Sequence, residues 1–292
     1  MDDLRAALVH VRPSAIREVA LEVPKVRWAD IGGQVHVKQK LQEAVEWPLN
    51  NPEAFRRMGI APPKGLLLYG PPGCSKTLMA KALATESSRN FLAVKGPELF
   101  SKWVGDSEKA VREVFRKARA ASPSIVFFDE IDSMAAARGG GNNVGDRVLS
   151  QLLIELDGIE PLKDVTVIAA TNRPDLIDPA LLRPGRIDRI LYVSPPDVES
   201  AQSIFAIQLA RMAHAQDVDC AVLARKAVGL SGAEIAAVCT EAAVCAMQED
   251  VEAERVEMRH LLQALDQCKP RITQDMLDFY ARYAQNCAVP AV

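Results

Sequence analysis

An apolar segment, a glycine-rich loop and a helical pattern follow one another between residues 65 and 87. GLLLY (65–69) is typical of a strand, and LMAKALATES is typical of a helix start; between them lies Gly70-Pro71-Pro72-Gly73-Cys74-Ser75-Lys76-Thr77. A buried strand that enters a helix through such a loop favours a parallel sheet covered by helices. The N–H groups at the helix start, together with Lys76, form a phosphate-binding arrangement in which the Thr77 hydroxyl can ligate Mg²⁺.

Five nearly continuous apolar segments are predicted to be strands, with helical patterns between them. The strands are Gly65–Tyr69, Asn90–Val94, Ser124–Phe128, Val165–Ala170 and Arg189–Val193, and the helices between them include Lys76–Ser87, Ser107–Ala121 and Asp146–Leu156. After Pro195-Pro196 only helices are predicted, at Ser200–Ala210, Val218–Ala227, Gly232–Met247, Glu257–Asp266 and Thr273–Tyr283, with Ser231 as an N-cap.

The predicted fold class is therefore α/β. A P-loop NTPase five-stranded parallel sheet with helices on both faces forms the large domain, and a small all-helical domain follows it. The predicted limits are 1–28 for a linker or lead-in, 29–196 for the large nucleotide-binding domain, and 197–292 for the small domain with its C-terminal helix.

Polar residues after two of the strands complete a candidate catalytic site. Asp129 and Glu130 end the third strand, where the first can hold a metal through water and the second can take a proton from attacking water. Asn172 follows the fourth strand and can orient that water; the alternative is an ordinary turn residue. Arg183 and Arg186 lie in a nearby loop, and the alternative is that they are solvated. We expect the loop and the acid pair to meet at adjoining strand tips.

Two residues of the phosphate loop, Ser75 and Cys74, are unusual. Ser75 stands where the usual pattern has glycine, and its Cβ crowds the place where backbone meets phosphate. Cys74 lies at a helix N-terminus beside Lys76, which could lower the pKa of its thiol and make it reactive. Cys239 and Cys245, in an alanine-rich helical pattern, are expected to be small buried residues.

Composition excludes several classes of protein. The 292 residues are 49% hydrophobic and 25% charged, which is typical of a globular protein. A net charge of -3 gives no long-range field for nucleic acid or an anionic membrane. No apolar run approaches the roughly 20 residues that cross a bilayer, and the acidic start Met1-Asp2-Asp3-Leu4 does not fit a secretory signal. Six cysteines without metal-like spacing favour a reducing compartment, so we expect a cytoplasmic protein, with a nuclear location left open.

With these residues assembled, the chain resembles the AAA family of AAA+ ATPases along nearly its whole length, including TNRPDLIDPALLRPGRIDR, which resembles that family's second region of homology. The resemblance implies that Asp129 is the metal-associated acid of the Walker B strand and Glu130 the catalytic base. It also implies that Asn172 is the first sensor, and that Arg183 and Arg186 are arginine fingers reaching a neighbouring subunit's nucleotide. Lys76 of the Walker A loop completes the predicted catalytic residues.

The same resemblance implies contacts with the rest of an ATP or ADP molecule. Asp30-Ile31-Gly32-Gly33 would meet adenine through its backbone, Ile204 and Gln208 would line base and ribose, and Gly232-Ala233 stands where related proteins place a second sensor arginine. For Ile204 and Gln208 the alternative is ordinary helix packing. The predicted nucleotide-binding set is Asp30, Ile31, Gly32, Pro72, Gly73, Cys74, Ser75, Lys76, Thr77, Leu78, Ile204, Gln208, Gly232 and Ala233, with Thr77 and Asp129 at the metal.

Further segments resemble parts that act on a protein client. Lys102-Trp103-Val104-Gly105 resembles a first pore loop, in which Trp103 would grip a polypeptide; the alternative is a core tryptophan. Residues 138–143 resemble a second pore loop or a plain connection, and Asp157-Gly158-Ile159 resembles a segment that relays nucleotide state between subunits.

Within the family, three segments most resemble the second ATPase module of the spermatogenesis-associated, or ATPase family gene two, proteins: GPPGCSKT, the lead-in VRPSAIREVALEVPKVRWADIGG and PRITQDMLDFYARY. These proteins are similar to valosin-containing protein. This implies a homo-hexamer in the full-length context, although a fragment could be monomeric. It also implies remodelling of a protein client, such as a pre-ribosomal factor, during maturation of the large ribosomal subunit. The alternatives are an ATP-binding assembly module with little or no hydrolysis, and a nucleic-acid motor, which the charge balance disfavours. No direct nucleic-acid or membrane partner is expected.

Overall fold

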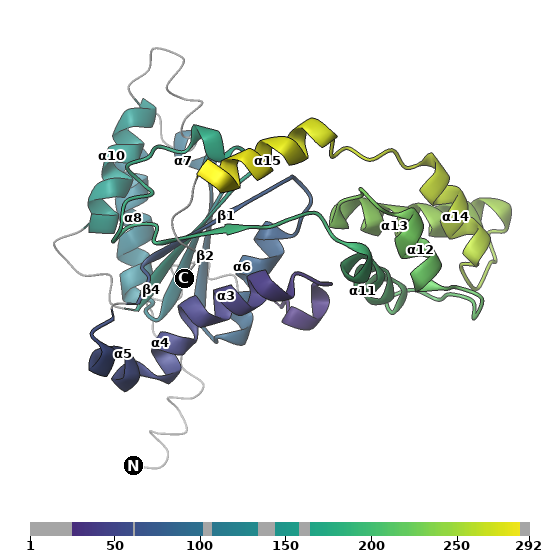
Figure 1. Cartoon of the computed structure of the whole chain (residues 1–292), viewed down its shortest axis with the longest axis horizontal. Coiled ribbons are helices and arrows are strands. Elements are labelled where there is room, and N and C mark those ends of the chain that lie inside the picture. The colour runs from purple at the N-terminus through teal and green to yellow at the C-terminus, as the bar shows by residue number, and fades with distance from the viewer. Residues whose placement is uncertain (1–24, 61, 102–106, 134–143, 158–163, 287–292) are drawn as a thin grey trace.

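The computed structural model describes residues 25–60, 62–101, 107–133, 144–157 and 164–286. Figure 1 shows a large part built around a sheet and a smaller helical part beside it, joined by the segment that follows the last strand. Most of the predicted lead-in lies outside the described residues. Val26 and Trp28, at its end, pack against the core of the large part.

The sheet has five parallel strands in the order β2-β3-β4-β1-β5. They are β1 (Gly65–Tyr69), β2 (Asn90–Lys95), β3 (Ser124–Asp129), β4 (Val165–Thr171) and β5 (Arg189–Tyr192). The sequence therefore predicted every strand to within one residue at each end, and the fold class is confirmed. The phosphate loop and the acid pair meet as predicted, through a hydrogen bond between Thr77 and Asp129, but their strand tips are not neighbours, because β4 lies between β1 and β3.

Helices cover both faces of the sheet, as predicted. On one face α8 (Ser107–Ala120) and α10 (Val144–Asp157) pack on Val126 and Phe128 of β3, and on the other α3 (Val35–Val45) and α6 (Lys76–Glu86) pack on Ile125 and Phe127. Successive residues of β3 thus enter opposite cores, which is why the strand is apolar throughout. The shorter elements are α4 (Trp47–Asn50), α5 (Pro52–Met58), α7 (Glu98–Ser101) and the 3-10 turns η1 (Trp28–Asp30) and η3 (Pro174–Leu176).

The smaller part consists of helices, as predicted. They are α11 (Val198–Leu209), α12 (Cys220–Lys226), α13 (Gly232–Glu249) and α14 (Met258–Gln267). Their shared core includes Phe205 and Leu261, and Cys239 and Cys245 are buried as predicted. The helix that follows, α15 (Gln274–Asn286), packs instead on Tyr69 and Tyr192 of the large part. Ser231 caps α13 in a full capping box with Glu234. No helix in the described part of the chain is long and apolar enough to cross a membrane.

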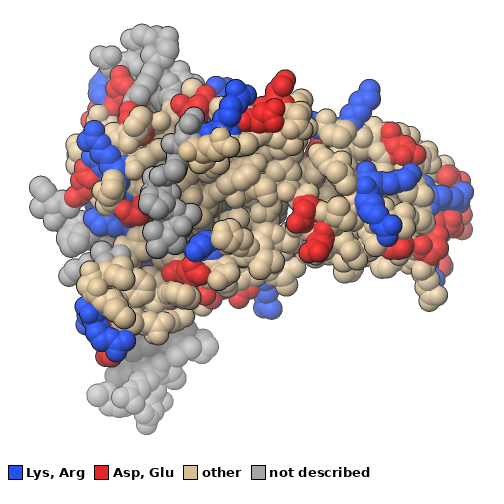
Figure 2. Space-filling view, in the orientation of Figure 1, with Lys and Arg blue, Asp and Glu red and all other residues tan. Residues whose placement is uncertain are grey.

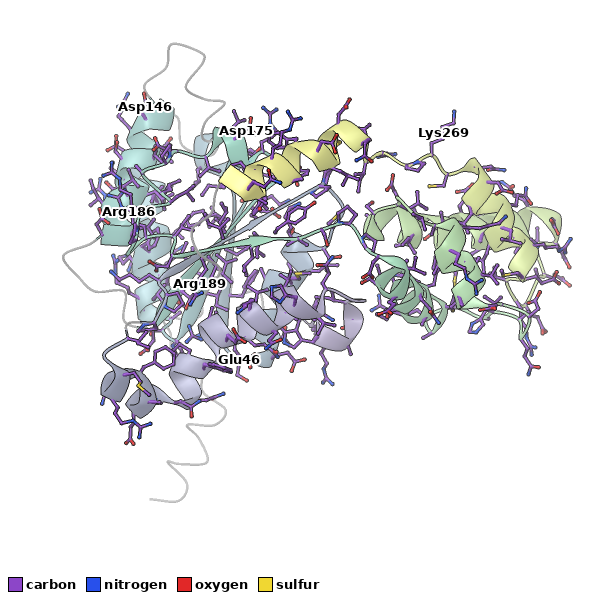
Figure 3. The ribbon with its side chains drawn as sticks, viewed as in Figure 1. Glu46, Asp146, Asp175, Arg186, Arg189 and Lys269 are labelled. Carbon is purple, nitrogen blue, oxygen red and sulfur yellow. The ribbon has the colours of Figure 1, made fainter. Side chains whose placement is uncertain are left out.

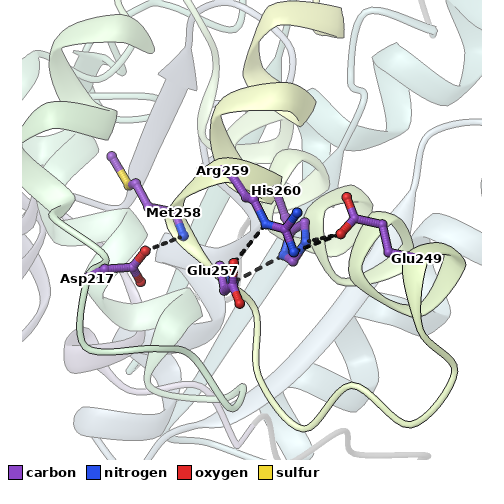
Figure 4. A network of polar contacts seen from close by, with 6 residues as sticks. All are labelled: Asp217, Glu249, Glu257, Met258, Arg259 and His260. Atoms are coloured by element: carbon purple, nitrogen blue, oxygen red, sulfur yellow. Dashed lines mark hydrogen bonds and ion pairs between the residues drawn. The ribbon is translucent and has the colours of Figure 1, made fainter.

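A polar network fixes α14 against the end of α13 (Figure 4). The buried His260 accepts the Glu257 N–H at Nδ1, 3.1 Å, and its Nε2 lies 3.1 Å from a carboxylate oxygen of Glu249. Arg259 bridges the same two glutamates, and the Met258 N–H donates to Asp217. These contacts close the loop between α13 and α14, so the small part is held together by polar contacts as well as by its apolar core.

Candidate active site

The phosphate loop leaves β1 at Gly70 and enters α6 at Lys76. Ser75, the N-cap of α6, adopts the left-handed conformation at φ 63°. A residue with a Cβ is strained there by about 1 to 3 kcal/mol, which gives a physical reason for the glycine of the usual pattern. The loop residues from Pro72 to Thr77 nevertheless line the pocket described below.

Lys76 is buried, and its ammonium group folds back onto the loop. It donates to the carbonyl oxygens of Gly70 at 2.8 Å and Pro71 at 2.7 Å. Burial lowers the pKa of Lys76 to about 8, an effect that the negative charges of Asp129 and Asp132 oppose. A bound phosphate group would add further negative charge beside this buried ammonium group.

Thr77 and Asp129 bring the loop and the acid pair together. The Thr77 hydroxyl donates to a carboxylate oxygen of Asp129 at 2.8 Å, although β4 separates their strands. Asp129 also accepts the N–H of Glu130 at 3.1 Å. Glu130 follows at φ 52°, a left-handed turn that ends β3 and leaves its side chain exposed at the pocket.

The tip of β4, which lies between the loop and the acid pair, carries Asn172. The Thr171 hydroxyl donates to Asp132 at 2.7 Å and accepts the Arg173 N–H at 2.9 Å, so the turn around Asn172 is fixed from both sides. Asp132 was not predicted from the sequence. The signal that could have identified it is its position two residues after the acid pair, in Asp129-Glu130-Ile131-Asp132.

A pocket of about 440 Å³ lies between the large and small parts at the carboxyl ends of the strands. Its lining contains every residue of the predicted nucleotide-binding set together with Asp129, Glu130 and Asn172, and also Ile207 and Ala236, which the sequence analysis did not name. These two lie three residues beyond Ile204 and Ala233, so helical periodicity could have added them. Whether the lining residues have their predicted roles stays a prediction.

Two glycines allow the parts to approach closely around this pocket. A Cβ on Gly32 would lie 2.5 Å from Ile204 Cγ1 and 2.7 Å from its backbone nitrogen. Gly73 has φ 76°, and a Cβ there would lie 2.8 Å from the Ser231 hydroxyl. The Ala233 N–H donates to the Gly73 carbonyl at 3.1 Å. Side chains at these glycines would separate the two walls of the pocket.

The hypothesis of a reactive Cys74 was wrong. The side chain is buried, and burial raises the pKa of the thiol to about 11, although Lys76 opposes the change. Loss of solvation outweighs the nearby charge because Lys76 is buried as well and directs its ammonium group to the loop carbonyls.

The two predicted finger arginines do not line their own chain's pocket. Arg183 is exposed. Arg186 donates two hydrogen bonds to the carboxylate of Asp157 in α10, from Nε to Oδ1 at 2.8 Å and from Nη2 to Oδ2 at 2.5 Å. Its third nitrogen donates to the Ala180 carbonyl. The hydrogen bond from Arg186 lowers the pKa of Asp157. In Figure 3, Arg186 lies on the side of the large part away from the small helical part.

Several predicted residues lie outside the described part of the chain. They are the three pore-loop residues Lys102, Trp103 and Val104, the segment 138–143, and Gly158 and Ile159.

Comparison with known families decides the identity of this fold and pocket. Residues 66–195 match the family described as ATPase family associated with various cellular activities (AAA), and residues 217–263 match the AAA+ lid domain. The chain belongs to the AAA family of ATPases. The lid of this AAA ATPase thus includes α12, α13 and the first part of α14, and its large part contains the residues that match the ATPase family.

Relatives match almost the whole AAA chain. It is 58% identical to the ATPase family gene 2 protein of Schizosaccharomyces pombe, over 98% of this chain and 35% of the relative. It is also 58% identical to the human ATPase family gene 2 protein homolog A, over 98% and 32%. It is 53% identical to the cell division cycle protein 48 homolog of Archaeoglobus fulgidus, over 98% and 41%. The chain thus spans about a third of the length of the first two relatives.

Proposed function

We propose that this AAA ATPase works in a ring, where Mg²⁺-dependent ATP hydrolysis remodels a protein client. The observation that carries the proposal is one pocket whose lining includes Lys76, Thr77, Asp129, Glu130 and Asn172. Asp30, Ile31 and Gly32 with Ile204 and Gln208 line the same pocket, and they suit a base and its ribose.

The residues can divide the chemistry of phosphoryl transfer between them. Lys76 would neutralise charge on the β and γ phosphates, and Glu130 would accept a proton from the attacking water. Asn172 would orient that water, since its strand tip lies between the loop and the acid pair. Little covalent chemistry is required, so placement and charge supply most of the catalysis.

The oxygen atoms of Thr77 and Asp129 fit a magnesium ion bound together with the nucleotide. Mg²⁺ prefers oxygen ligands and keeps several waters, so one hydroxyl, one carboxylate and the phosphates suffice. Among the described residues there is no group of three or more His, Cys, Asp or Glu side chains that could hold a metal by themselves. This fits an ion that arrives with ATP, where it would neutralise phosphate charge.

Arg183 and Arg186 are proposed to serve a neighbouring subunit. Their absence from the pocket of their own chain and the position of Arg186 at the far side of the large part support this role. Asp157 would fix the position of the Arg186 guanidinium group, which donates to both of its oxygens. Hydrolysis would then require assembly, and we propose a homo-hexamer in the full-length protein.

We further propose that the client is a protein, handled by Trp103 in the ring pore, and that the full-length protein acts in the cytoplasm on large-ribosomal-subunit maturation. Support for the last point is the similarity to the ATPase family gene 2 proteins, and the role of Trp103 rests on the sequence alone.

A nucleic-acid substrate is not proposed. On the described residues of the face in Figure 2, basic side chains are interspersed with acidic ones rather than gathered into a continuous band.

The test separates client handling from ATP turnover. Trp103→Ala should abolish remodelling of an unfolded model protein while ATP turnover stays close to wild type. Light scattering after size exclusion, with and without a non-hydrolysable ATP analogue, should show a nucleotide-dependent ring in the same samples. Remodelling by the Trp103→Ala ring at the wild-type rate would refute the role of Trp103, and a monomer in both states would refute assembly of this chain on its own.

A further inference from the structure

The C-terminal helix α15 leaves the lid and lies against the large domain (Figure 1). A linker that contains Lys269 connects α14 to α15 (Figure 3), and Ile272 packs on the core of the large domain. The final described helix is therefore a strap over the nucleotide-binding domain rather than another lid helix.

Aromatic packing holds α15 at the carboxyl ends of β1 and β5. Tyr280 is 2% exposed. Its ring centroid lies 6.4 Å from that of Tyr69 and 5.9 Å from that of Tyr192. Tyr283, one turn further along, packs edge-on against Tyr69 at 5.2 Å. Tyr69 is the last residue of β1 and directly precedes the phosphate loop, so the strap docks beside the pocket.

The Tyr280 hydroxyl makes a specific contact within this cluster. It donates to the backbone carbonyl of Asn172 at 2.7 Å, across 108 residues of sequence. Burial raises the pKa of Tyr280 to about 12, so the hydroxyl keeps its proton and remains a donor at neutral pH. The carbonyl that it binds belongs to the same residue whose side chain lines the pocket.

The strap also connects to the lid wall of the same pocket. The Arg271 N–H donates to Glu234 at 2.9 Å, and the other oxygen of Glu234 accepts the N–H and the hydroxyl of Ser231. Ser231 caps α13 directly before Gly232 and Ala233, which line the pocket. The segment from Arg271 to Tyr280 thus joins the lid side of the pocket to the tip of β4.

We propose that Tyr280 is a positioning residue for ATP hydrolysis: its hydroxyl fixes the Asn172 peptide, and thereby the Asn172 amide, so that turnover depends on docking of the C-terminal helix. The inference rests on the proposed role of Asn172. Thr171 and Asp132 anchor one side of this turn and Tyr280 anchors the carbonyl at its centre. Without the tyrosine hydroxyl this peptide would be held, among the described residues, only through the Arg173 N–H on the Thr171 hydroxyl, so the Asn172 side chain would spend less time directed at the water.

Tyr280→Phe is the direct test, because it keeps the ring in the aromatic cluster and removes only the donor. Turnover under saturating ATP should fall about fivefold, which corresponds to loss of about 1 kcal/mol of interaction in the transition state. The KM for ATP should stay within about twofold, since the contact orients water rather than binding nucleotide. Tyr192→Phe is the matched control: it makes the same change in the same cluster, and its hydroxyl is not the donor to Asn172.

A double-mutant cycle with Asn172→Ala separates positioning from structural damage. If Tyr280 acts through the Asn172 side chain, Tyr280→Phe should have little further effect once that side chain is removed. Equal losses in the wild-type and Asn172→Ala backgrounds, or equal turnover in Tyr280→Phe and Tyr192→Phe, would overturn the proposal. If Asn172→Ala itself turned over ATP at the wild-type rate, the proposed role of Asn172 would fail instead.

Hydrogen exchange provides a readout that does not depend on turnover. The peptide that contains Thr171, Asn172 and Arg173 should exchange faster in Tyr280→Phe than in wild type or Tyr192→Phe, with unchanged melting temperatures within a few degrees. Equal exchange of that peptide in all three proteins would show that the hydroxyl does not fix the turn.

Discussion

Lys76 is buried although it carries a positive charge, so we expect the stability of the ATP-free protein to depend on pH. Its pKa is lowered to about 8, whereas an exposed lysine stays charged to about 10.4. Between these two values the folded ATP-free protein binds fewer protons than the unfolded chain. Below pH 8 the cost of burying the charge therefore lowers the free energy of unfolding in full. The free energy of unfolding rises again as the pH increases from about 8 to about 10.4.

ATP binding should show the opposite dependence on pH. Phosphates favour the charged lysine, so ATP affinity should fall by up to about tenfold per pH unit above pH 8. Titration calorimetry between pH 7 and 9.5 would measure this. The control is Lys76→Arg, which stays charged, so whatever its absolute affinity it should lack this slope. A wild-type affinity that is constant from pH 7 to 9.5 would contradict the account of Lys76.

Cys74 supplies a second prediction at the scale of a residue. Because its thiol is buried with a pKa of about 11, iodoacetamide at pH 8 should modify the partly exposed Cys220 and Cys268 well before Cys74. Peptide mapping by mass spectrometry over a time course would give the order. Modification of Cys74 before both other thiols would show that the loop opens or that Lys76 activates the thiol after all.

Among the elements, the segment directly after η1 packs closely on α11, and both line the pocket. Gly32→Ala would place a Cβ 2.5 Å from Ile204, whose helix belongs to the small part. We expect ATP affinity to fall about tenfold, because the two walls must separate, while the sheet core stays intact. Calorimetry and thermal unfolding would separate these effects.

Gly59→Ala is the control for this change. Gly59 has φ 67° with nothing within 4 Å of an added Cβ, so alanine should cost about 1 kcal/mol of stability and leave ATP affinity unchanged. If both variants bound ATP like wild type, close contact at Gly32 would not matter for nucleotide binding.

The sequence predicted the strands well because each is buried on both faces and therefore nearly continuously apolar. It could not predict the strand order, since β4 between β1 and β3 is a tertiary arrangement that no local pattern records. The helices before β1 have weaker patterns and were not named. The docking of Tyr280 on Asn172 spans 108 residues, and nothing in either local sequence indicates it.

For the candidate site too, local sequence patterns were sufficient for some residues, whereas others depended on the tertiary structure. Residues in continuous motifs, such as Ser75 to Thr77 and Asp129-Glu130, were named from sequence and line one pocket. Asp132 was missed although it follows the acid pair closely, because its contact with the Thr171 hydroxyl joins two strand ends that are far apart in the sequence. The reactivity of Cys74 was misjudged because sequence shows the neighbouring charge of Lys76 but not the burial that outweighs it.

In the whole assembled molecule, one active site is proposed to contain residues of two subunits. Arg183→Ala/Arg186→Ala subunits and Glu130→Gln subunits should each be nearly inactive. Mixing them should restore part of the activity, because the first keeps its own Glu130 and receives arginines from the second. Turnover measured against mixing ratio would test this. Inactivity at every ratio would contradict sharing, provided light scattering shows mixed rings.

The most direct test of the central claim is ATP binding and turnover by Glu130→Gln compared with wild type. The account predicts that the variant binds ATP with nearly wild-type affinity, since Glu130 is exposed at the pocket rim, and that its turnover falls by at least about a hundredfold without the base. Equal turnover by the two proteins would contradict it, because water would then be activated elsewhere than in the pocket between the phosphate loop and the lid.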